Sequence, residues 1–548
     1  MIKYRGNPWA VLIVMSLGFF MTLLDLTIVN IAIPNMIAKL HASLDGVLWV
    51  INAYALGLAV LLITAGRLGD LRGQRTMFIT GVVTFTLASA ACGLSPNVGS
   101  LVAFRAAQGV GAALLLPQTL AILTTVFPPE RRGAAFGIWG AVAGVATIAG
   151  PTLGGLLVSA FDWRYIFFIN VPIGVAVIVL SVFLIPDVRV GGKHRLDFTG
   201  VLLATAALLA ICYGLVEGQR YSWGKVTSFI SIPLVIGAGV LLLGVFLAVQ
   251  ARTQDREPLV PFALFRNRNF SLMNWVSGVL SVGMMGIFLP FTIYLQSALG
   301  FSALKAGLTM APASVVSMFV APVAGRLTDK IGGKYILMSG LAFFAIGFGL
   351  AAAIATPDST WQDFFPSFAI AGLGMGCTFA PMTTIAMRNI QPQVAGAASG
   401  MINTVRQVGS VIGVAAIGAL LQNRLSVALP AVAARRAGVL PPQQRSHFVA
   451  GFAASAQHGS AANPGQGNVK LPPGTSPSLA AELHKLASEV FSAGYVNAMH
   501  STLAFPIALM VVASLSCLGI QRSRRPARPA EAAQPESSGL PEASQATA

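Results

Sequence analysis

Fourteen long apolar segments dominate this sequence and leave it few possible folds. Most are about 20 residues long or longer, the length that an α-helix needs to cross the hydrocarbon core of a bilayer. Backbone polar groups find no water there, so a spanning segment must form a helix or part of a closed barrel. The pattern predicts an all-α integral membrane protein with fourteen transmembrane helices, at residues 8–33, 47–65, 76–95, 99–127, 134–160, 163–185, 198–216, 228–250, 271–298, 306–324, 335–356, 364–387, 396–420 and 501–520.

Composition agrees with a membrane protein and argues against several soluble classes. Apolar residues make up 55% of the 548 residues and charged residues 10%, against about 25% charged residues in an ordinary soluble domain. The sequence contains no GxxxxGK[ST] motif, so ATP hydrolysis by this chain is not expected. The six histidines and four cysteines show no metal-ligand spacing. We therefore expect neither an enzyme nor a protein with a metal or other cofactor.

Lysine and arginine predict the orientation of the helices. If the N-terminus lies inside, 22 of these residues fall in inside segments and 5 in the short outside loops. Cytoplasmic loops carry such an excess of positive charge, so we expect an even number of helices with both termini in the cytoplasm. The net charge of +17 then follows from topology, and a nucleic-acid partner is not expected.

A repeated motif divides the chain. GRLGDLRGQR at 66–75 lies between the second and third apolar segments, and GRLTDKIGGK at 325–334 lies between the tenth and eleventh. An offset of eight segments predicts six helices, two extra helices and six more, and parallel halves of this kind are a transporter pattern. The expected parts are an N-terminal half, two linker helices with flanking loops, a C-terminal half and a disordered cytoplasmic tail, at 1–185, 186–270, 271–520 and 521–548.

A long polar stretch interrupts the C-terminal half. Residues 421–500 are expected to form an extracytoplasmic loop, and Ala, Gly, Pro, Ser and Gln dominate 426–478, which predicts mostly irregular structure. Ser476-Pro477 then predicts the start of an amphipathic helix that ends near Gly494.

Three ionisable residues inside apolar segments, Asp25, Arg105 and Arg406, are candidates for function, because a charge within the membrane is costly. Asp25 lies in segment 8–33. A carboxyl group withdrawn from water can exchange a proton with its surroundings, as a proton carrier must, and the alternative is an aspartate that a partner keeps ionised. Arg105 lies in segment 99–127. It can tune a carboxylate across the bundle, and the alternative is an arginine that reaches to the membrane surface.

The repeated motif is too basic to be buried in the membrane. Asp70 within it can bridge the neighbouring arginines or lie against a helix N-terminus, where the helix dipole favours an anion. Either contact would hold the two halves closed on the inside, and the repeat at Asp329 favours this role over a simple positive-inside loop. The candidate residues of this gate loop are Gly66, Arg67, Asp70, Arg72, Gly73, Arg75 and Asp329.

Segment 134–160 is rich in glycine. Glycines four residues apart, at Gly140 and Gly144 and again at Gly150 and Gly154, form a smooth face that another helix can approach closely. Pro151 predicts a kink, because proline removes a backbone hydrogen bond. Tight helix packing alone would explain this composition, but the phrase GPTLGG at 150–155 is more informative.

Seven stretches together resemble one transporter family: LDLTIVNIAIP (24–34), WVINAYAL (49–56), GRLGDLRGQR (66–75), RAAQGVGAALLLPQ (105–118), GPTLGG (150–155), WRYIFFINVPIG (163–174) and GAASGMINTVRQVGSVIGVA (396–415). Each alone is weak, but their order along nearly the whole chain is specific. The chain resembles the fourteen-helix drug:proton antiporters of the QacA/EmrB type, within the major facilitator superfamily.

The resemblance implies roles for particular residues. Asp25 matches the acid linked to proton coupling and cationic substrates, and Arg105 matches an arginine assigned to proton transfer. Asp70, Arg72 and Arg75 match the gate loop. Relatives that export dications carry additional acids in the tenth and thirteenth helices, and segments 306–324 and 396–420 contain none, which argues against strong dication selectivity. The antiporter motif that seals and bends its helix corresponds to Gly150, Pro151, Gly154 and Gly155.

We therefore expect a drug:proton antiporter in the inner membrane of a bacterium, which exports drugs or natural products by alternating access with the proton gradient as its energy source. Its substrate would be an amphipathic, often cationic, small molecule. Arg406 can face the substrate cavity or pair structurally, and core packing explains the aromatic candidates equally well. The residues expected near the cavity are Trp49, Asn52, Tyr54, Gln108, Trp139, Tyr294, Asn403, Arg406 and Gln407.

Two other functions stay open at this point. One is a proton-coupled importer of a small metabolite, against which GPTLGG and the acid in the first helix count. The other is a non-transporting receptor or scaffold, on which view the stretch 421–500 would bind a partner but Asp25 and Arg105 would be hard to explain. Besides substrate, protons and the lipid bilayer, the sequence leaves open a periplasmic adaptor protein and the oligomeric state.

Overall fold

The computed structural model describes residues 6–40, 44–186, 197–218, 220–221, 223–227, 229–256, 258–440, 442–457 and 477–521. Within these ranges the chain is helical, and the one strand-like feature is an isolated bridge between Lys225 and Ser231. The predicted all-α class is therefore confirmed. The predicted tail, 521–548, lies outside the described residues except for Gln521.

Every predicted apolar segment is helical over most of its described length, and two of them, 163–185 and 364–387, are each divided between two α-helices. Among the described residues, thirteen spans are long and apolar enough to cross a membrane, and the remaining segment, 134–160, lies on α5. The first half and the linker contain α1 (Pro8–Leu40), α2 (Leu44–Arg72), α3 (Gln74–Gly93), α4 (Val98–Val126), α5 (Arg132–Ala160), α6 (Tyr165–Phe168), α7 (Asn170–Leu184), α8 (Phe198–Glu217) and α9 (Ile232–Arg252). The second half contains α10 (Ala263–Arg266), α11 (Arg268–Ile293), α12 (Ala303–Ile331), α13 (Lys334–Ile354), α14 (Phe365–Gly376), α15 (Phe379–Met387), α16 (Ala395–Arg436), α17 (Pro442–Gln457) and α18 (Pro477–Ser516).

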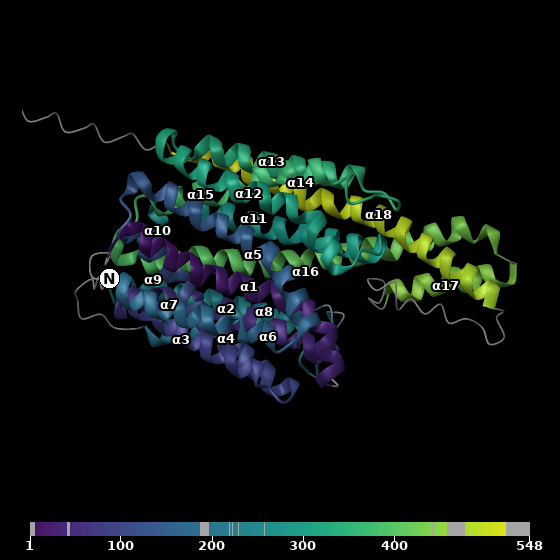
Figure 1. Ribbon diagram of the computed structural model, residues 1–548, viewed down its shortest axis with the longest axis horizontal. Helices are drawn as coiled ribbons and strands as arrows, with labels where there is room; N and C mark the ends of the chain where they lie inside the picture. Colours follow the sequence, from purple (N-terminus) through teal and green to yellow (C-terminus); the bar gives the residue numbers. More distant parts are fainter. Residues whose placement is uncertain are drawn as a thin grey trace, which may run out of the picture.

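The two halves lie side by side and are joined by helices that cross between them. Figure 1 shows α11, α12, α13 and α14 on one side and α2, α3, α4 and α7 on the other, with α1, α5 and α16 between. Helix α5 packs on α1 of its own half and on α12 of the other, whereas α16 packs on α11 of its own half and on α2 of the other. The two crossing helices thus have equivalent places in the two halves.

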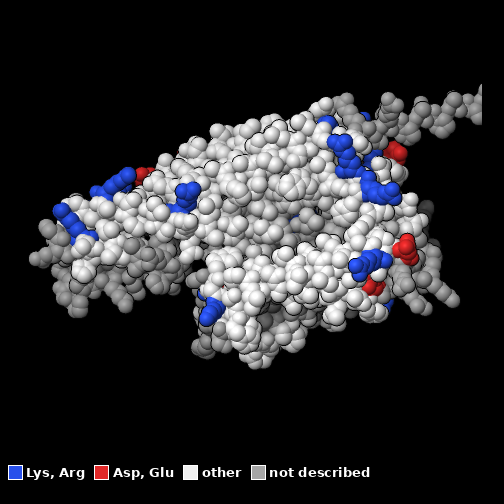
Figure 2. All heavy atoms as spheres, turned by 180° about the vertical axis from the view of Figure 1, so that it is seen from behind, with Lys and Arg blue, Asp and Glu red and all other residues white. Residues whose placement is uncertain are grey.

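Charged side chains gather towards the two ends of the molecule, with an almost uncharged band between them (Figure 2). This distribution is what a bilayer requires, because apolar side chains face lipid and charges face water or headgroups. Many large apolar side chains on the outside of the bundle are exposed, for example Leu202, Leu241 and Phe319. Exposure of this kind suits a lipid environment.

The linker helices bridge the two halves. Helices α8 and α9 pack on one another, and α8 also contacts α2 and α16. A buried cluster at this place joins Val60 and Ile63 of α2 with Leu208 of α8 and Phe246 of α9, and Met401 of α16 packs against it. The two additional helices therefore cover one edge of the seam between the halves.

The stretch predicted as irregular is partly helical, and this prediction was wrong for its described residues. Helix α16 continues without a break to Arg436, α17 follows, and α18 begins at Pro477 as expected but passes Gly494 and runs on to Ser516. Apolar residues of the three helices form their own small core, which includes Val432, Phe448 and Leu486. A polar, alanine-rich composition hid these helices, because alanine is also the best helix former. Residues 458–476 lie outside the described residues.

Glycines let the halves approach backbone to backbone at one end of the molecule. A Cβ on Gly325 of α12 would overlap the carbonyl oxygen of Gly133 on α5, and one on Gly66 of α2 would overlap that of Gly396 on α16. We call this end, where the repeated motifs lie, the gate end. The close approach is required at these pairs because no side chain fits between the two helices.

We predict that Gly325→Val lowers the melting temperature of the purified protein, because a side chain there must push α5 and α12 apart at a cost of about 1–3 kcal/mol. Gly349→Val on neighbouring α13 is the matched control, since a Cβ there would meet nothing within 4 Å. Thermal unfolding followed by tryptophan fluorescence measures both variants. Equal melting temperatures would contradict the assigned contact.

Candidate functional site

A carboxylate and a guanidinium group pair in the middle of the N-terminal half. Asp25 on α1 and Arg105 on α4 are both fully buried, and Arg105 Nη1 lies 2.5 Å from Asp25 Oδ2. The structure thus brings together the two residues that the sequence predicted as proton-coupling candidates. In this conformation the aspartate has the ionic partner that was one of the two alternatives for it.

Two side-chain amides complete the hydrogen bonds of this carboxylate. Gln108 Nε2 donates to Asp25 Oδ1 over 2.9 Å, and Asn170 Nδ2 donates to the same oxygen over 3.3 Å. Asn170 Nδ2 also donates to Ser89 Oγ (3.1 Å), whose hydroxyl donates to the carbonyl of Phe167 (2.9 Å). Asp25 therefore accepts hydrogen bonds from three side chains, and a set made only of donors fits a charged carboxylate.

Arg105 is fixed on every side. Its Nε donates to the carbonyl of Val50 (3.0 Å), its Nη1 donates to Gln108 Oε1 (2.8 Å), and its guanidinium lies 4.4 Å from the centre of the Tyr54 ring. Gly109 makes this possible, because a Cβ there would overlap the carbonyl oxygen of Tyr54 and hold α4 away from α2. The structure excludes the alternative in which Arg105 reaches to the membrane surface.

Asn170 and Ser89 are members of this network that the sequence analysis missed. Both are fully buried, and Asn170 Oδ1 is a buried oxygen without a hydrogen-bond partner among the described residues. One is a single asparagine near the start of α7 and the other a serine on α3. No sequence spacing identifies either residue as part of a functional site. Only the packing of α7 against α1, and of α3 against α7, places them near Asp25.

Two aspartates at the gate end bind the N-termini of helices in the opposite half. Asp70 accepts hydrogen bonds from the backbone N–H groups of Gly396 and Ala397 at the start of α16, each 2.8 Å long. Asp329 accepts the equivalent pair from Gly133 and Ala134 at the start of α5, at 2.8 and 2.9 Å. Free N–H groups and the helix dipole both favour an anion there. Asp70 was expected either to bridge the neighbouring arginines or to lie against a helix N-terminus, and the structure shows the second contact.

The gate motif is helical for most of its length, and its prediction as a loop was wrong. Gly66 to Arg72 form the last two turns of α2, and the turn into α3 is made at Gly73, which has a φ of 97°. Only glycine adopts that angle without strain, and Gly332 (φ 90°) does the same after Asp329. One residue is thus enough to connect α2 with α3, and two, Gly332 and Gly333, connect α12 with α13.

The arginines of the gate motif have different surroundings. Arg67 is buried, with 7% of its surface exposed, which corrects the expectation that the whole motif is too basic for burial. Arg72 is exposed. Arg75 Nη2 donates to the carbonyl of Val182 on α7 over 2.6 Å and so ties α3 to α7 within the N-terminal half.

Arg132 is a further residue of the gate end that the sequence analysis did not select. It is buried, its Nη2 donates to the carbonyl of Thr124, and its Nη1 donates to the carbonyls of Met387 (3.1 Å) and Arg388 (3.3 Å) in the opposite half. These carbonyls lie at the C-terminal end of α15, where the helix dipole favours a cation. Its neighbour Arg131 looks the same in sequence, so no local signal distinguishes the two.

The antiporter motif packs against the helix that carries the buried acid. A Cβ on Gly150 would overlap Thr27 Oγ1 of α1, and one on Gly154 would lie 2.8 Å from Ile28 Cγ1. The predicted smooth face therefore contacts α1 two residues beyond Asp25. A Cβ on Gly155 would meet nothing within 4 Å, so this glycine does not take part. Helix α5 continues through Pro151 without interruption.

The residues predicted near the substrate cavity do not gather at one place. Tyr54 and Gln108 belong to the Asp25 network. The ring centre of Trp49 lies 6.0 Å from that of Tyr213 on α8, and Tyr294 donates to the carbonyl of Thr356 over 2.6 Å within an aromatic cluster of the C-terminal half. The polar candidates Asn52 and Gln407 are both half-buried.

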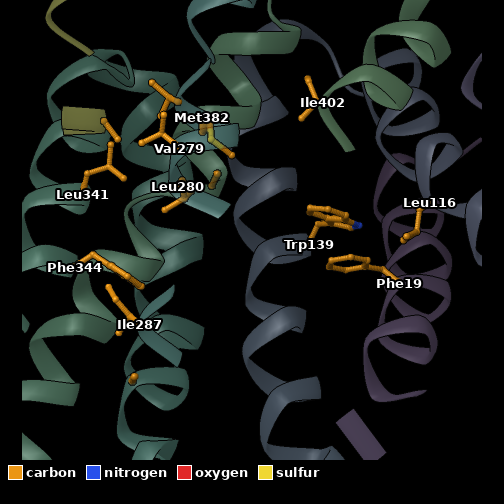
Figure 3. Close-up of a cluster of buried hydrophobic side chains, with 14 of the residues drawn as sticks. Phe19, Leu116, Trp139, Val279, Leu280, Ile287, Leu341, Phe344, Met382 and Ile402 are labelled. Atoms are coloured by element: carbon orange, nitrogen blue, oxygen red, sulfur yellow. The ribbon is translucent and has the colours of Figure 1, made fainter. Parts of the chain in front are cut away.

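Trp139 and the pair Asn403 and Arg406 lie on the two crossing helices. Trp139 stacks on Phe19 of α1 with ring centres 3.9 Å apart, and Figure 3 shows this pair beside Leu116, with Ile402 of α16 on the same side of α5. Arg406 Nη2 donates to Asn403 Oδ1 over 2.8 Å on α16. Apolar rings and one polar pair thus lie on the helices that separate the two halves.

Comparison with known proteins shows the same family along most of the chain. The family model of the Major Facilitator Superfamily matches residues 15–414. An uncharacterised MFS-type transporter of Mycobacterium tuberculosis is 40% identical over 429 residues, which cover 78% of this chain and 73% of that protein. The tetracenomycin C resistance and export protein of Streptomyces glaucescens is 35% identical over 430 residues, 78% of each chain.

Further similarities concern another named protein and the fold. The multidrug resistance protein Stp of Mycobacterium tuberculosis is 35% identical over 419 residues, 76% of each chain. Among solved structures, the human organic anion transporter MFSD10 matches with a TM-score of 0.56 and covers 92% of this chain and 99% of that chain. Its sequence identity is only 12%, so this likeness shows the fold alone.

We predict that Asp70→Asn and Asp329→Asn each shift the protein towards a form that is open at the gate end, because each weakens a charged contact with a helix N-terminus. Loss of a capping group costs about 1 kcal/mol, or roughly a fivefold change in the equilibrium. Spin labels on Thr76→Cys and Tyr335→Cys, exposed positions of α3 and α13, would report longer distances by pulsed electron resonance. Asp363→Asn, in an exposed turn, is the control, and unchanged distances in all three variants would contradict the gate role.

Proposed function

The chain belongs to the Major Facilitator Superfamily, and from that premise we propose that it is a proton-driven exporter of amphipathic drugs or natural products. The observation that carries the proposal is the fully buried pair of Asp25 and Arg105 with its two amides. A charged pair in the membrane interior is expensive. If the pair is a coupling site that binds and releases a proton, its function explains why this costly charged pair is present in the membrane interior.

Protonation of Asp25 changes what its neighbours can do. The charged carboxylate accepts from Arg105, Gln108 and Asn170, whereas the protonated form has a donor of its own and holds the guanidinium weakly. The unpartnered Oδ1 of Asn170 is the nearby acceptor that a turned amide would offer to this proton. Binding a proton therefore loosens α1 from α4 and α7, and this difference between the two forms can bias a conformational equilibrium.

Alternating access would use the contacts at the gate end. Asp70, Asp329 and Arg132 each bind a helix end of the opposite half, so a form open at that end must break all three. If the gate end faces the cytoplasm, as the charge distribution predicts, the present conformation is closed towards the cytoplasm. Helix α5 packs on α1 through Gly150, which provides a path from the protonation of Asp25 to the gate.

The direction of transport and the class of substrate rest on the relatives. Two are named for export or resistance to compounds, the tetracenomycin C protein and the multidrug resistance protein Stp. We infer export of amphipathic small molecules across the cytoplasmic membrane of a bacterium. An adaptor protein beyond that membrane stays a proposal, and the small three-helix core of α16, α17 and α18 is compatible with it.

We predict that cells expressing this chain extrude an amphipathic fluorescent dye, and that a protonophore abolishes the extrusion because the proton gradient is the energy source. Dye fluorescence over time measures efflux with and without the protonophore. In everted vesicles acidified inside, an antiporter loads the dye, whereas an importer driven by protons does not. Efflux that persists after the gradient collapses would contradict proton coupling.

We predict that Asp25→Asn retains expression and membrane insertion but abolishes proton-coupled efflux, because asparagine replaces the carboxylate in shape and cannot carry a proton. Asp162→Asn is the matched control, as its carboxylate pairs with Lys39 near the surface. Exposed pairs contribute about 1 kcal/mol or less, so this variant is expected to export normally. Undiminished efflux by Asp25→Asn at normal expression would refute Asp25 as the coupling site.

A further inference from the structure

We propose that Arg406 binds an anionic group of the transported molecule, so that the preferred substrates of this protein are amphipathic acids, with a carboxylate as the simplest case. The proposal rests on the export function above and assigns a substrate class to it. It departs from the often cationic substrate that the sequence resemblance implied. It is carried by the charges of the membrane interior, the contacts of Arg406 and the face of α16 on which it lies.

Few charges lie within the apolar segments. Apart from Arg164 at the edge of 163–185, the fourteen segments contain only Asp25, Arg105 and Arg406. Asp25 and Arg105 neutralise one another through a direct contact. Arg406 is then the charge that remains uncompensated, and an isolated arginine at the centre of a membrane helix costs about 2.5–3.5 kcal/mol even on the mildest scale.

The contacts of Arg406 leave most of its donors available. Its Nη2 donates to the Asn403 amide oxygen, and no carboxylate of the described residues lies within 4 Å of its guanidinium. A guanidinium has five N–H donors in a planar fork that matches both oxygens of a carboxylate. The side chain is half-buried, so a ligand can reach it.

Asn403 and Ser399 hold this arginine in place. Asn403 Nδ2 donates to the carbonyl of Ser399 (2.9 Å), which fixes the amide so that its oxygen accepts from Arg406. Both Asn403 and Ser399 are buried. One corner of the fork is thus anchored on α16, while the others stay available, and a guanidinium prepared in this way loses little freedom when it binds.

The faces of α16 show where Arg406 points. Gly400 packs on α2, Gly409 packs on α11, and Met401 and Val408 pack with the linker helices. The fourth face of the helix, opposite the linker helices, contains Ser399, Asn403, Arg406 and Ser410. Because the linker helices cover one edge of the seam between the halves, this polar face is turned away from that edge, and α16 also contacts α4 of the other half. A substrate between the halves would meet it.

The repeat between the halves shows that the scaffold does not need a charge here. Gly133 and Ala134 of α5 correspond to Gly396 and Ala397 of α16, because each pair binds the equivalent aspartate. Counting nine residues from Ala134 and from Ala397 places Ala143 opposite Arg406. An alanine satisfies the packing of one crossing helix, so the arginine on the other serves a purpose beyond packing.

A substrate cation finds no free carboxylate in this interior, since Asp25 is saturated by Arg105, Gln108 and Asn170. It would also be repelled by Arg406. An anion gains a charge-assisted, two-point contact at Arg406, the strong kind of hydrogen bond. The stacked rings of Trp139 on the crossing helix α5 and Phe19 on α1 suit the apolar body of an amphipathic acid.

The test compares three probes with the same apolar body and different charges: 4-(1-pyrenyl)butyrate, 4-(1-pyrenyl)butanol and 4-(1-pyrenyl)butylamine. Binding to the full-length protein in nanodiscs of zwitterionic lipid is measured and corrected for empty nanodiscs. The butyrate is expected to bind at least tenfold more tightly than the butanol, and the butylamine more weakly than both. Equal binding of butyrate and butylamine by the natural protein would overturn the proposal.

Variants decide whether Arg406 is responsible. Arg406→Gln is expected to reduce the preference for butyrate over butanol about tenfold, and Arg406→Lys, which keeps the charge but not the fork, to retain part of it. Arg424→Gln, an exposed arginine further along α16, is the control with an unchanged preference. A preference that survives Arg406→Gln would overturn the proposal. If Arg406→Gln does not fold, Arg406→Lys and the three probes on the natural protein still decide.

A second readout separates this inference from the export function. Proteoliposomes with a pH gradient measure whether any probe moves, independently of which probe binds. Lack of gradient-driven movement together with an intact preference for butyrate would contradict proton-driven export and support the anion site. Movement of all three probes at equal rates, with equal affinities, would support export and overturn the anion site.

Discussion

The architecture depends on one interaction that occurs twice, a carboxylate of one half bound to the N-terminus of a helix in the other. Asp70 binds α16 and Asp329 binds α5 through two backbone N–H groups each. This contact needs glycine, because a side chain at Gly66, Gly133, Gly325 or Gly396 would separate the backbones. The small residues and the charged helix caps are therefore both needed for the same contact between the halves. Without the close approach the carboxylates would not reach the opposite helix.

This contact between the halves is reversible, unlike an apolar interface. Charge–dipole contacts at a helix end stabilise by about 0.3–2 kcal/mol each, and their groups find water when they separate at the membrane surface. A few such contacts can favour a closed form by a few kcal/mol without locking it, which is the range in which a proton or a ligand can shift a population. The buried pair of Asp25 and Arg105 is different, because it breaks in the absence of water. In the proposed mechanism, protonation of Asp25 lowers the free energy needed to separate this pair.

Sequence predicted those features that a single segment or a repeat reveals. Hydropathy gave the helices because the bilayer forces each apolar run into a helix, and the recurrence of the motif around Asp70 and Asp329 gave the two halves. The gate motif was taken for a loop because its arginines suggested water, whereas one glycine with positive φ suffices for the turn. Asn170, Ser89 and Arg132 were missed because their roles arise from contacts between helices distant in sequence. The extension of α16 was missed because the composition of an alanine-rich polar stretch is compatible with both a helix and an irregular loop.

The two halves share a scaffold but differ in their charges, and we propose that this difference carries the function. The gate contacts, the crossing helices α5 and α16 and their glycines follow the repeat. Asp25 and Arg105 have balanced charges in the N-terminal half, whereas Arg406 in the C-terminal half is bound by an amide alone. The sequence repeat explains why the contacts at the gate end are symmetric. A proton site and a substrate site on opposite halves can be linked through that gate without direct contact, because each needs only to favour a different arrangement of the same two bodies.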